Sequence, residues 1–225
     1  RPIKESEISK YVVRGQYTEG LRRGVKVPAY RDEKDVPADS KTETYVAMKL
    51  FVDNWRWTDI PFYIRTGKNL PVRVTEVVLH LKPAPLQLFK QRCSSSPTNM
   101  IILRIHPDAG IAVDFGMKIS GAGYKVQNVN MDFHYSDLTQ SKIPEAYERL
   151  LLDCMIGDST LYARADAVQA SWKFVDPILN EWKKNPDIPL YFYNANTWGP
   201  DEADNLFENK KLKWQDQCDN FASEI

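Results

Sequence analysis

Apolar and polar residues alternate with a period of two through much of the chain. The clearest runs cover residues 42–52, 74–81, 100–106, 111–119 and 129–135. Strict alternation of this kind is typical of a β-strand that buries one of its faces. Successive runs are joined by short connections, whereas parallel neighbours would need crossovers of about a dozen residues or more. The pattern therefore predicts a large, mostly antiparallel β-sheet.

Shorter extended segments accompany these runs. Three further strands are predicted at residues 11–17, 61–65 and 190–193. Residues 20–40 carry many charges, glycine and proline without any periodicity, which is typical of a long loop. Residues 86–96 begin with apolar side chains and end in a serine-rich break.

Two segments in the last third of the chain have the period of amphipathic helices. Residues 147–155 carry apolar side chains at intervals of three and four, with Pro144 before them and Gly157 as a stop. The second segment contains Pro177, a predicted kink, and has an apolar stripe formed by Val168, Trp172, Val175, Leu179 and Trp182. A final short helix is predicted at residues 200–211. Because one face of the sheet is apolar and needs a cover, we expect an α+β fold with helices packed on one face.

The opposite face of the predicted sheet is mixed in character. It carries Arg104, His106, Asp114, Lys118, Asp132 and His134. Such a face could meet solvent or a second copy of itself, as in isologous dimers.

A turn after the strand at residues 61–65 carries three cations, namely Arg65, Lys68 and Arg73. The turn itself is built from Gly67, Asn69 and Pro71. Glycine permits positive φ and a close approach of backbone to a ligand, while asparagine and proline favour a fixed turn. Cations on a rigid loop could receive a small anion such as a phosphate group. Taken alone, however, the pattern favours ordinary solvated surface cations.

Composition excludes several classes of protein. The 30 basic and 30 acidic residues balance, so nothing argues for nucleic acid or an anionic membrane as partner. No apolar run approaches the ~20 residues of a membrane span. The three cysteines, Cys93, Cys154 and Cys218, lack metal-binding or redox spacing, so we expect free thiols in a reducing cytoplasm.

A series of sequence blocks covers almost the whole chain. They are Val-Arg-Gly-Gln-Tyr at 13–17, Ser-Lys-Thr-Glu-Thr at 40–44, Asp-Asn-Trp-Arg-Trp at 53–57, Arg-Thr-Gly-Lys at 65–68, Ala-Tyr-Glu-Arg-Leu at 146–150 and Trp-Gly-Pro-Asp-Glu-Ala-Asp at 198–204. The set and its order resemble the C-terminal domain of glucose-6-phosphate dehydrogenase in its bacterial form. Because the blocks span the chain, the resemblance is far more specific than any single motif.

The resemblance implies part of an oxidoreductase of the pentose phosphate pathway, which oxidises glucose 6-phosphate to 6-phosphogluconolactone with NADP (possible use of NAD is left open). The family's Gly-rich dinucleotide loop, its His-Tyr-Leu-Gly-Lys motif and its catalytic His are absent from these 225 residues. We therefore expect residues 1–225 to be a C-terminal substrate-binding and dimerisation domain without catalytic residues, inactive alone. NADP would be bound mainly by the missing N-terminal domain.

The resemblance assigns substrate contacts to Lys68 and Arg73. In the family, the lysine of the Arg-Thr-Gly-Lys block contacts the sugar phosphate, and a basic residue five positions later does likewise. Arg65 is equally suited to pairing with a carboxylate. The histidines are expected to be structural, although His106 occupies a position where some relatives place a substrate-contacting Gln; the others are His80 and His134.

Some members of the family, notably animal ones, bind a second, structural NADP in this domain. Arg104 and Asp132 match two of its contacts. Basic residues at four other positions are replaced, by Val74, Val78, Asp114 and Trp198. This loss of cations predicts no structural NADP here, and no metal site is expected.

The expected partners are glucose 6-phosphate, the protein's own N-terminal domain, and further copies in a homodimer or tetramer through the sheet. An alternative of a different class is a non-catalytic β-sheet module that dimerises or binds sugar phosphates. The gene upstream of Arg1 discriminates between them, since only the enzyme requires a Gly-rich loop there.

Overall fold

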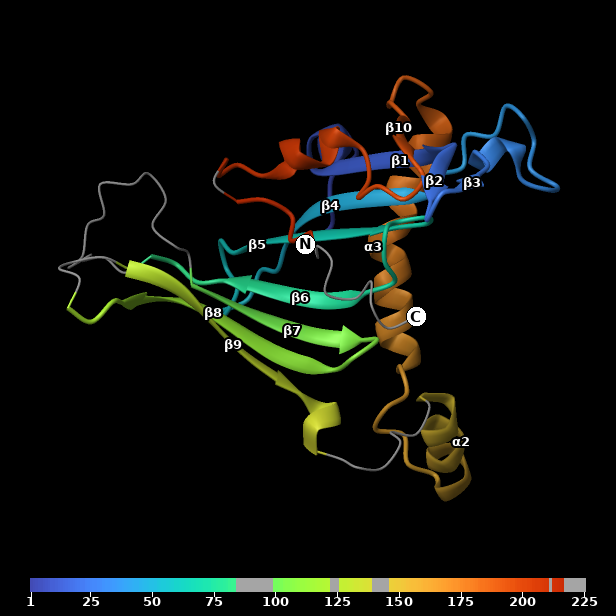
Figure 1. The fold of residues 1–225 in the computed structure, drawn as a ribbon. Coiled ribbons are helices and arrows are strands. Elements are labelled where there is room, and N and C mark those ends of the chain that lie inside the picture. Colours follow the sequence, from blue (N-terminus) through green and yellow to red (C-terminus); the bar gives the residue numbers. More distant parts are fainter. Residues whose placement is uncertain (84–98, 122–125, 139–145, 211, 217–225) are drawn as a thin grey trace. The chain divides into compact units, whose positions relative to one another are not determined.

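The computed structural model describes residues 1–83, 99–121, 126–138, 146–210 and 212–216 (Figure 1). The chain divides into two compact units. The first combines Arg1–Val72 with Tyr162–Ile225, and the second is Arg73–Leu161.

The first unit is built on a four-stranded sheet. Its strands lie in the order β10 (Tyr191–Asn194), β1 (Val12–Thr18), β4 (Tyr45–Phe51) and β5 (Pro61–Gly67). β1 pairs antiparallel with β4, and β4 with β5, as the alternation predicts. β10 pairs parallel with β1, an arrangement that the sequence pattern did not indicate.

Both faces of this sheet are covered. On one face, α1 (Ile8–Tyr11) and α3 (Ala165–Lys184) contribute to a cluster of Ile3, Ile8, Val12, Ile178, Trp182 and Ile188. On the other face, the 3₁₀ helix η4 (Asp201–Leu206) contributes to a cluster of Val13, Tyr17, Tyr45, Ala47, Tyr193, Ala195, Ala203 and Leu206. The final predicted helix is therefore shorter and of the 3₁₀ type.

The predicted long loop at residues 20–40 contains structure of its own. β2 (Gly20–Arg22) and β3 (Val25–Val27) form a hairpin, followed by the 3₁₀ helix η2 (Tyr30–Asp32). Both residues of its tight turn, Arg23 and Gly24, have positive φ, which matches the right-handed twist of a hairpin. Another 3₁₀ turn, η1 (Glu5–Glu7), precedes α1.

The second unit contains a four-stranded antiparallel sheet in the order β6 (Thr75–His80), β7 (Met100–His106), β8 (Gly110–Lys118) and β9 (Val126–His134). It also contains η3 (Tyr135–Leu138) and α2 (Ala146–Ile156). The predicted α+β class with mostly antiparallel strands is confirmed, and its strands are shared between two four-stranded sheets and a hairpin.

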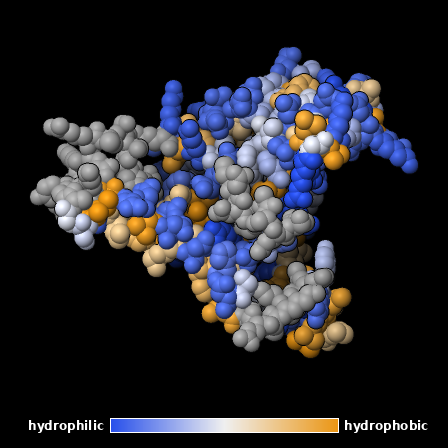
Figure 2. Space-filling view, viewed as in Figure 1, coloured by the Kyte–Doolittle hydropathy of each residue, from blue (hydrophilic) through white to orange (hydrophobic). Residues whose placement is uncertain are grey.

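The register of the second sheet gathers apolar side chains on one face. Val77, Leu103, Ile111 and Phe133 occupy one row across the strands, and Leu79, Ile101, Val113 and Met131 occupy the next. Several of them are exposed, including Met131 at 62%. Figure 2 shows apolar patches along this sheet. Burial in this sheet is deepest on the opposite face, at Ile102 and Ala112. The expected packing of helices on a sheet face is found in the first unit, where α1 and α3 contribute to the core.

The two long helices begin and end close to their predicted limits. α2 ends before Gly157, whose φ of 75° suits a helix stop. Its apolar stripe is exposed, with Tyr147 at 78%, whereas Asp153 is buried and pairs with Arg149. α3 continues through Pro177, and only its second half, at Ile178 and Trp182, is buried.

Candidate functional site

The loop that follows β5 is fixed through its backbone. The Lys68 N–H donates to the carbonyl of Thr44 at 2.8 Å, and the Tyr193 hydroxyl donates to the carbonyl of Lys68 at 2.7 Å. The next residue, Asn69, accepts a 2.7 Å hydrogen bond from the N–H of Asn196. Two segments distant in sequence, one at Thr44 and one at residues 193–196, therefore hold the backbone at Lys68 and Asn69 in place.

Gly67 has a different role from the one its position in the turn indicates. The positive φ of the turn belongs to Asn69, at 49°, and not to Gly67. A Cβ at Gly67 would lie 2.8 Å from Cδ2 of Tyr45. The glycine therefore allows the end of β5 to pack against the ring of Tyr45. This contact helps to position the next residue, Lys68.

Tyr193 and Thr44 form the buried support of this loop. Their hydroxyl oxygens are 3.1 Å apart, and the Thr44 hydroxyl also accepts from the N–H of Tyr17 at 3.0 Å. Burial raises the pKa of Tyr193, so its hydroxyl stays a proton donor. Sequence reasoning missed both residues as supports, although Thr44 ends the Ser-Lys-Thr-Glu-Thr block.

We expect Tyr193→Phe to lower the free energy of unfolding by about 1–3 kcal/mol, because the Lys68 carbonyl loses its donor. Urea denaturation measures this change. Tyr191→Phe is a matched control on the same strand, since no hydrogen bond of its hydroxyl is described. Equal losses in the two variants would contradict the role assigned to Tyr193.

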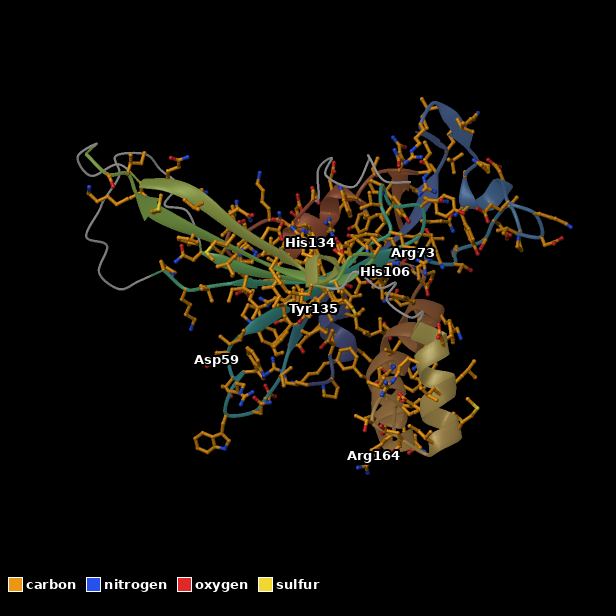
Figure 3. All side chains as sticks on the ribbon, turned by 60° about the horizontal axis from the view of Figure 1, so that its bottom comes forward. Asp59, Arg73, His106, His134, Tyr135 and Arg164 are labelled. Carbon is orange, nitrogen blue, oxygen red and sulfur yellow. The ribbon has the colours of Figure 1, made fainter. Side chains whose placement is uncertain are left out.

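The side chains of the two predicted substrate ligands are exposed. Lys68 belongs to the first unit, and Arg73 is the first residue of the second. Among the described residues, neither side chain has a hydrogen bond or an ion pair. Arg73 lies two residues before Thr75, which pairs with His106, so these two residues occupy the same end of the second sheet (Figure 3).

Arg65, the third cation of the turn, is bound within the protein. It donates to the Gln215 carbonyl at 2.8 Å and to Asp216 at 2.7 Å. Its guanidinium lies 4.7 Å from the ring centre of Trp198 and 5.1 Å from that of Trp214. The carboxylate-pairing interpretation of Arg65 is therefore confirmed.

Arg104 and Asp132, the two residues that match structural NADP contacts, bind each other. Their closest atoms are 2.5 Å apart, and Arg104 holds the pKa of Asp132 below its usual range. His134 joins the same group, with Nδ1 2.6 Å from Asp108. Arg104 is thus paired with a carboxylate of its own sheet in this structure.

The remaining histidines and cysteines that the structure describes form no cluster with metal-ligand or catalytic geometry. Burial lowers the pKa of His80. Cys154 is a free, exposed thiol, whereas Cys93 and Cys218 lie outside the described residues. Within the described part of the chain, no group of three His, Cys, Asp or Glu side chains could hold a metal ion. None of the described helices is both long and apolar enough to cross a membrane.

A match of residues 1–215 to one family model makes this chain a C-terminal domain of the sugar-phosphate dehydrogenase class. The family model described as "Glucose-6-phosphate dehydrogenase, C-terminal domain" matches residues 1–215. The chain belongs to this family.

Relatives of known name agree with this assignment. The chain is 47% identical over 226 residues to glucose-6-phosphate 1-dehydrogenase of Treponema pallidum, covering 100% of this chain and 44% of the relative. It is 49% identical over 215 residues to the enzyme of Aggregatibacter actinomycetemcomitans, covering 96% and 42%. The chain thus spans less than half the length of these curated relatives.

Solved structures have the same fold. A glucose-6-phosphate dehydrogenase in complex with its substrate glucose 6-phosphate matches with a TM-score of 0.80 at 28% identity, over 96% of this chain and 43% of that one. Glucose-6-phosphate 1-dehydrogenase from Mycobacterium avium matches with a TM-score of 0.73 at 34% identity, over 93% and 41%.

Proposed function

We propose that residues 1–225 form the C-terminal, substrate-binding and subunit-contact domain of a cytoplasmic enzyme that oxidises glucose 6-phosphate to 6-phosphogluconolactone. The family match over residues 1–215 is the observation that carries this proposal. NADP, held mainly by an N-terminal domain, would accept the hydride from C1 of the sugar. The part played by this chain is to position the sugar phosphate.

Within this proposal, Lys68 and Arg73 bind the phosphate side of the substrate. Both cations are exposed, and neither is engaged by a described residue. The backbone of Lys68 is held by Thr44 and Tyr193, so little conformational freedom of the loop remains to be lost on binding. A lysine supplies a compact charge and an arginine a bidentate fork for phosphate oxygens.

The proposed partner of α2 is the N-terminal domain. A row of large apolar side chains exposed on one helix is typical of a surface that contacts another domain or protein. The exposed side chains on α2 are Tyr147, Leu151, Leu152, Met155 and Ile156. The curated relatives are more than twice as long as the matched region, which supplies the chain needed to cover this helix.

A second copy of the chain is the proposed partner of the exposed sheet face in the second unit. This apolar face replaces the mixed face favoured by the sequence pattern, because Arg104 and Asp132 on the mixed face bind each other. A sheet face that meets the same face of a second copy makes an isologous contact. The apolar rows of both copies are then buried in one interface.

The decisive experiment is an assay of NADP reduction by glucose 6-phosphate. The protein expressed from its complete gene should be active, and purified residues 1–225 should show no turnover. Turnover by residues 1–225 alone would contradict the proposal that the N-terminal domain holds the NADP needed for catalysis. Inactivity of the complete protein, with binding of the sugar phosphate retained, would favour the non-catalytic module.

A further inference from the structure

The first unit contains a cleft that is separate from the Lys68 side chain. Its volume is about 430 Å³, within the range of small-molecule sites. It lies where the end of α3 meets β1 and the segment before β4. The lining residues that matter here are Arg14, Lys41, Glu43, Leu179, Trp182 and Lys183.

Arg14 brings a buried positive charge to this cleft. Only 6% of the residue is exposed, and its guanidinium carbon lies 5.3 Å from the ring centre of Trp182. Nη2 donates to the Ile188 carbonyl at 2.8 Å and Nε to the Pro189 carbonyl at 3.4 Å. No described residue accepts a hydrogen bond from Nη1, and none forms an ion pair with Arg14.

This charge is only partly compensated. Two carbonyl dipoles satisfy two of the three nitrogens, but a buried cation is costly without a bound anion. Burial lowers the pKa of Arg14, and the charge of nearby Glu43 opposes that shift without closing an ion pair. Nη1 of Arg14 is not among the described buried atoms that lack a hydrogen-bond partner, so it is accessible and can donate to an anionic group in the cleft.

The rest of the lining adds an aromatic surface and more positive charge. Trp182 is only 8% exposed, and its indole Nε1 has no hydrogen-bond partner among the described residues. Lys41 and Lys183 are exposed at the cleft, so three cations face the single carboxylate of Glu43. The indole ring and Leu179 supply apolar surface beside these charges.

We propose that this cleft binds a small organic anion, a carboxylate or phosphate group joined to an apolar body. The oxyanion is held by Arg14 and by the two lysines, and the apolar body packs against Trp182 and Leu179. The small, concave shape favours a small molecule over an extended peptide.

Binding in this cleft would also affect the loop at Lys68, through the segment that links the two. Gln16 donates through Nε2 to the carbonyls of Ser40 and Thr42, at 3.0 and 2.8 Å, which fixes the segment that lines the cleft. Two residues later, Thr44 holds the backbone of Lys68. A bound anion would therefore alter the KM for the sugar phosphate. This consequence rests on the proposed function, whereas anion binding does not.

The test is a calorimetric titration of the protein expressed from its complete gene. Benzoate and phenyl phosphate are the probes, and benzyl alcohol and inorganic phosphate are the comparators that lack one half of the ligand. We expect at least one probe to bind more tightly than both comparators. The same probe should shift the NMR signal of the Trp182 indole N–H. The two probes distinguish a carboxylate ligand from a phosphate ligand.

Variants at the rim of the cleft locate the site. Lys183→Ala should weaken binding by about three- to tenfold through the loss of one charged contact. Lys184→Ala is the matched control, because Lys184 does not line the cleft and should leave affinity unchanged. Arg14→Met should abolish binding, and Lys41→Ala replaces it as the test if that variant does not fold.

Several results would overturn the proposal. They are the failure of both probes to bind at about 10 mM, equal binding of benzyl alcohol, affinity unaffected by both Lys41→Ala and Lys183→Ala, or a carboxylate from elsewhere in the protein found on Arg14. If the protein expressed from its complete gene binds a probe but shows no dehydrogenase activity, the proposed function is contradicted and the anion site is not.

Discussion

Replacing Lys68 with alanine should raise the KM for glucose 6-phosphate by about 10- to 150-fold in the protein expressed from its complete gene. A hydrogen bond to a charged group contributes about 1.5–3 kcal/mol, and each 1.4 kcal/mol changes binding tenfold. The phosphate takes no part in bond breaking at C1, so its contact stabilises substrate and transition state alike. We therefore expect kcat to change much less than KM. Steady-state kinetics over a range of sugar phosphate concentrations measures both.

Two further variants separate the site from general effects of charge. Lys34→Ala removes another exposed lysine of the first unit and should leave KM unchanged. Lys68→Arg keeps the charge and should recover part of the affinity, since it loses only the geometry of the contact. An unchanged KM in Lys68→Ala would show that Lys68 is an ordinary surface cation and not a substrate ligand.

The strands of this protein could be predicted because their alternation is local. Burial could not, as Lys49 illustrates. It stands at an alternating position of β4 that the pattern placed opposite the apolar face, yet its side chain is only 2% exposed. Its ammonium lies near the rings of Tyr11, Phe51 and Tyr63, and it pairs with Glu208. Except for Phe51, these partners are distant in sequence from Lys49, and distant partners leave no trace in a period of two.

The same limit applies to the candidate site. The Arg-Thr-Gly-Lys block predicted Lys68 as a substrate ligand, because a motif is local. The residues that hold its backbone, Thr44 and Tyr193, come from segments 24 residues before and 125 residues after it. Gly67 was correctly noticed as special, but its reason is the ring of Tyr45 and not its own φ.

The exposed apolar face of the second sheet shows how the two kinds of information combine. Alternation predicted that Ile111, Met131 and Phe133 share a face, and the strand register confirms it. What covers that face is a tertiary question. Within the second unit these side chains are exposed, and the proposed partner of the face is a second copy of the chain.

Met131→Asp should convert the proposed dimer to a monomer, with a dissociation constant raised at least about 100-fold. Met131 is the most exposed member of the apolar rows on this face, so the folded monomer tolerates the change. At an isologous interface the substitution buries two unpaired carboxylates, one from each copy, and each costs several kcal/mol of desolvation. Sedimentation velocity over a range of protein concentrations measures the shift.

Asn128→Asp is the matched control for this experiment. Asn128 is exposed on the same strand, β9, but its side chain points to the opposite face of the sheet. The added charge is the same, so a general effect of net charge would dissociate both variants. Dissociation of Met131→Asp alone places the contact on the apolar face. A Met131→Asp protein that stays dimeric would exclude that face as the interface, because a carboxylate in a dry apolar contact has no partner to compensate it.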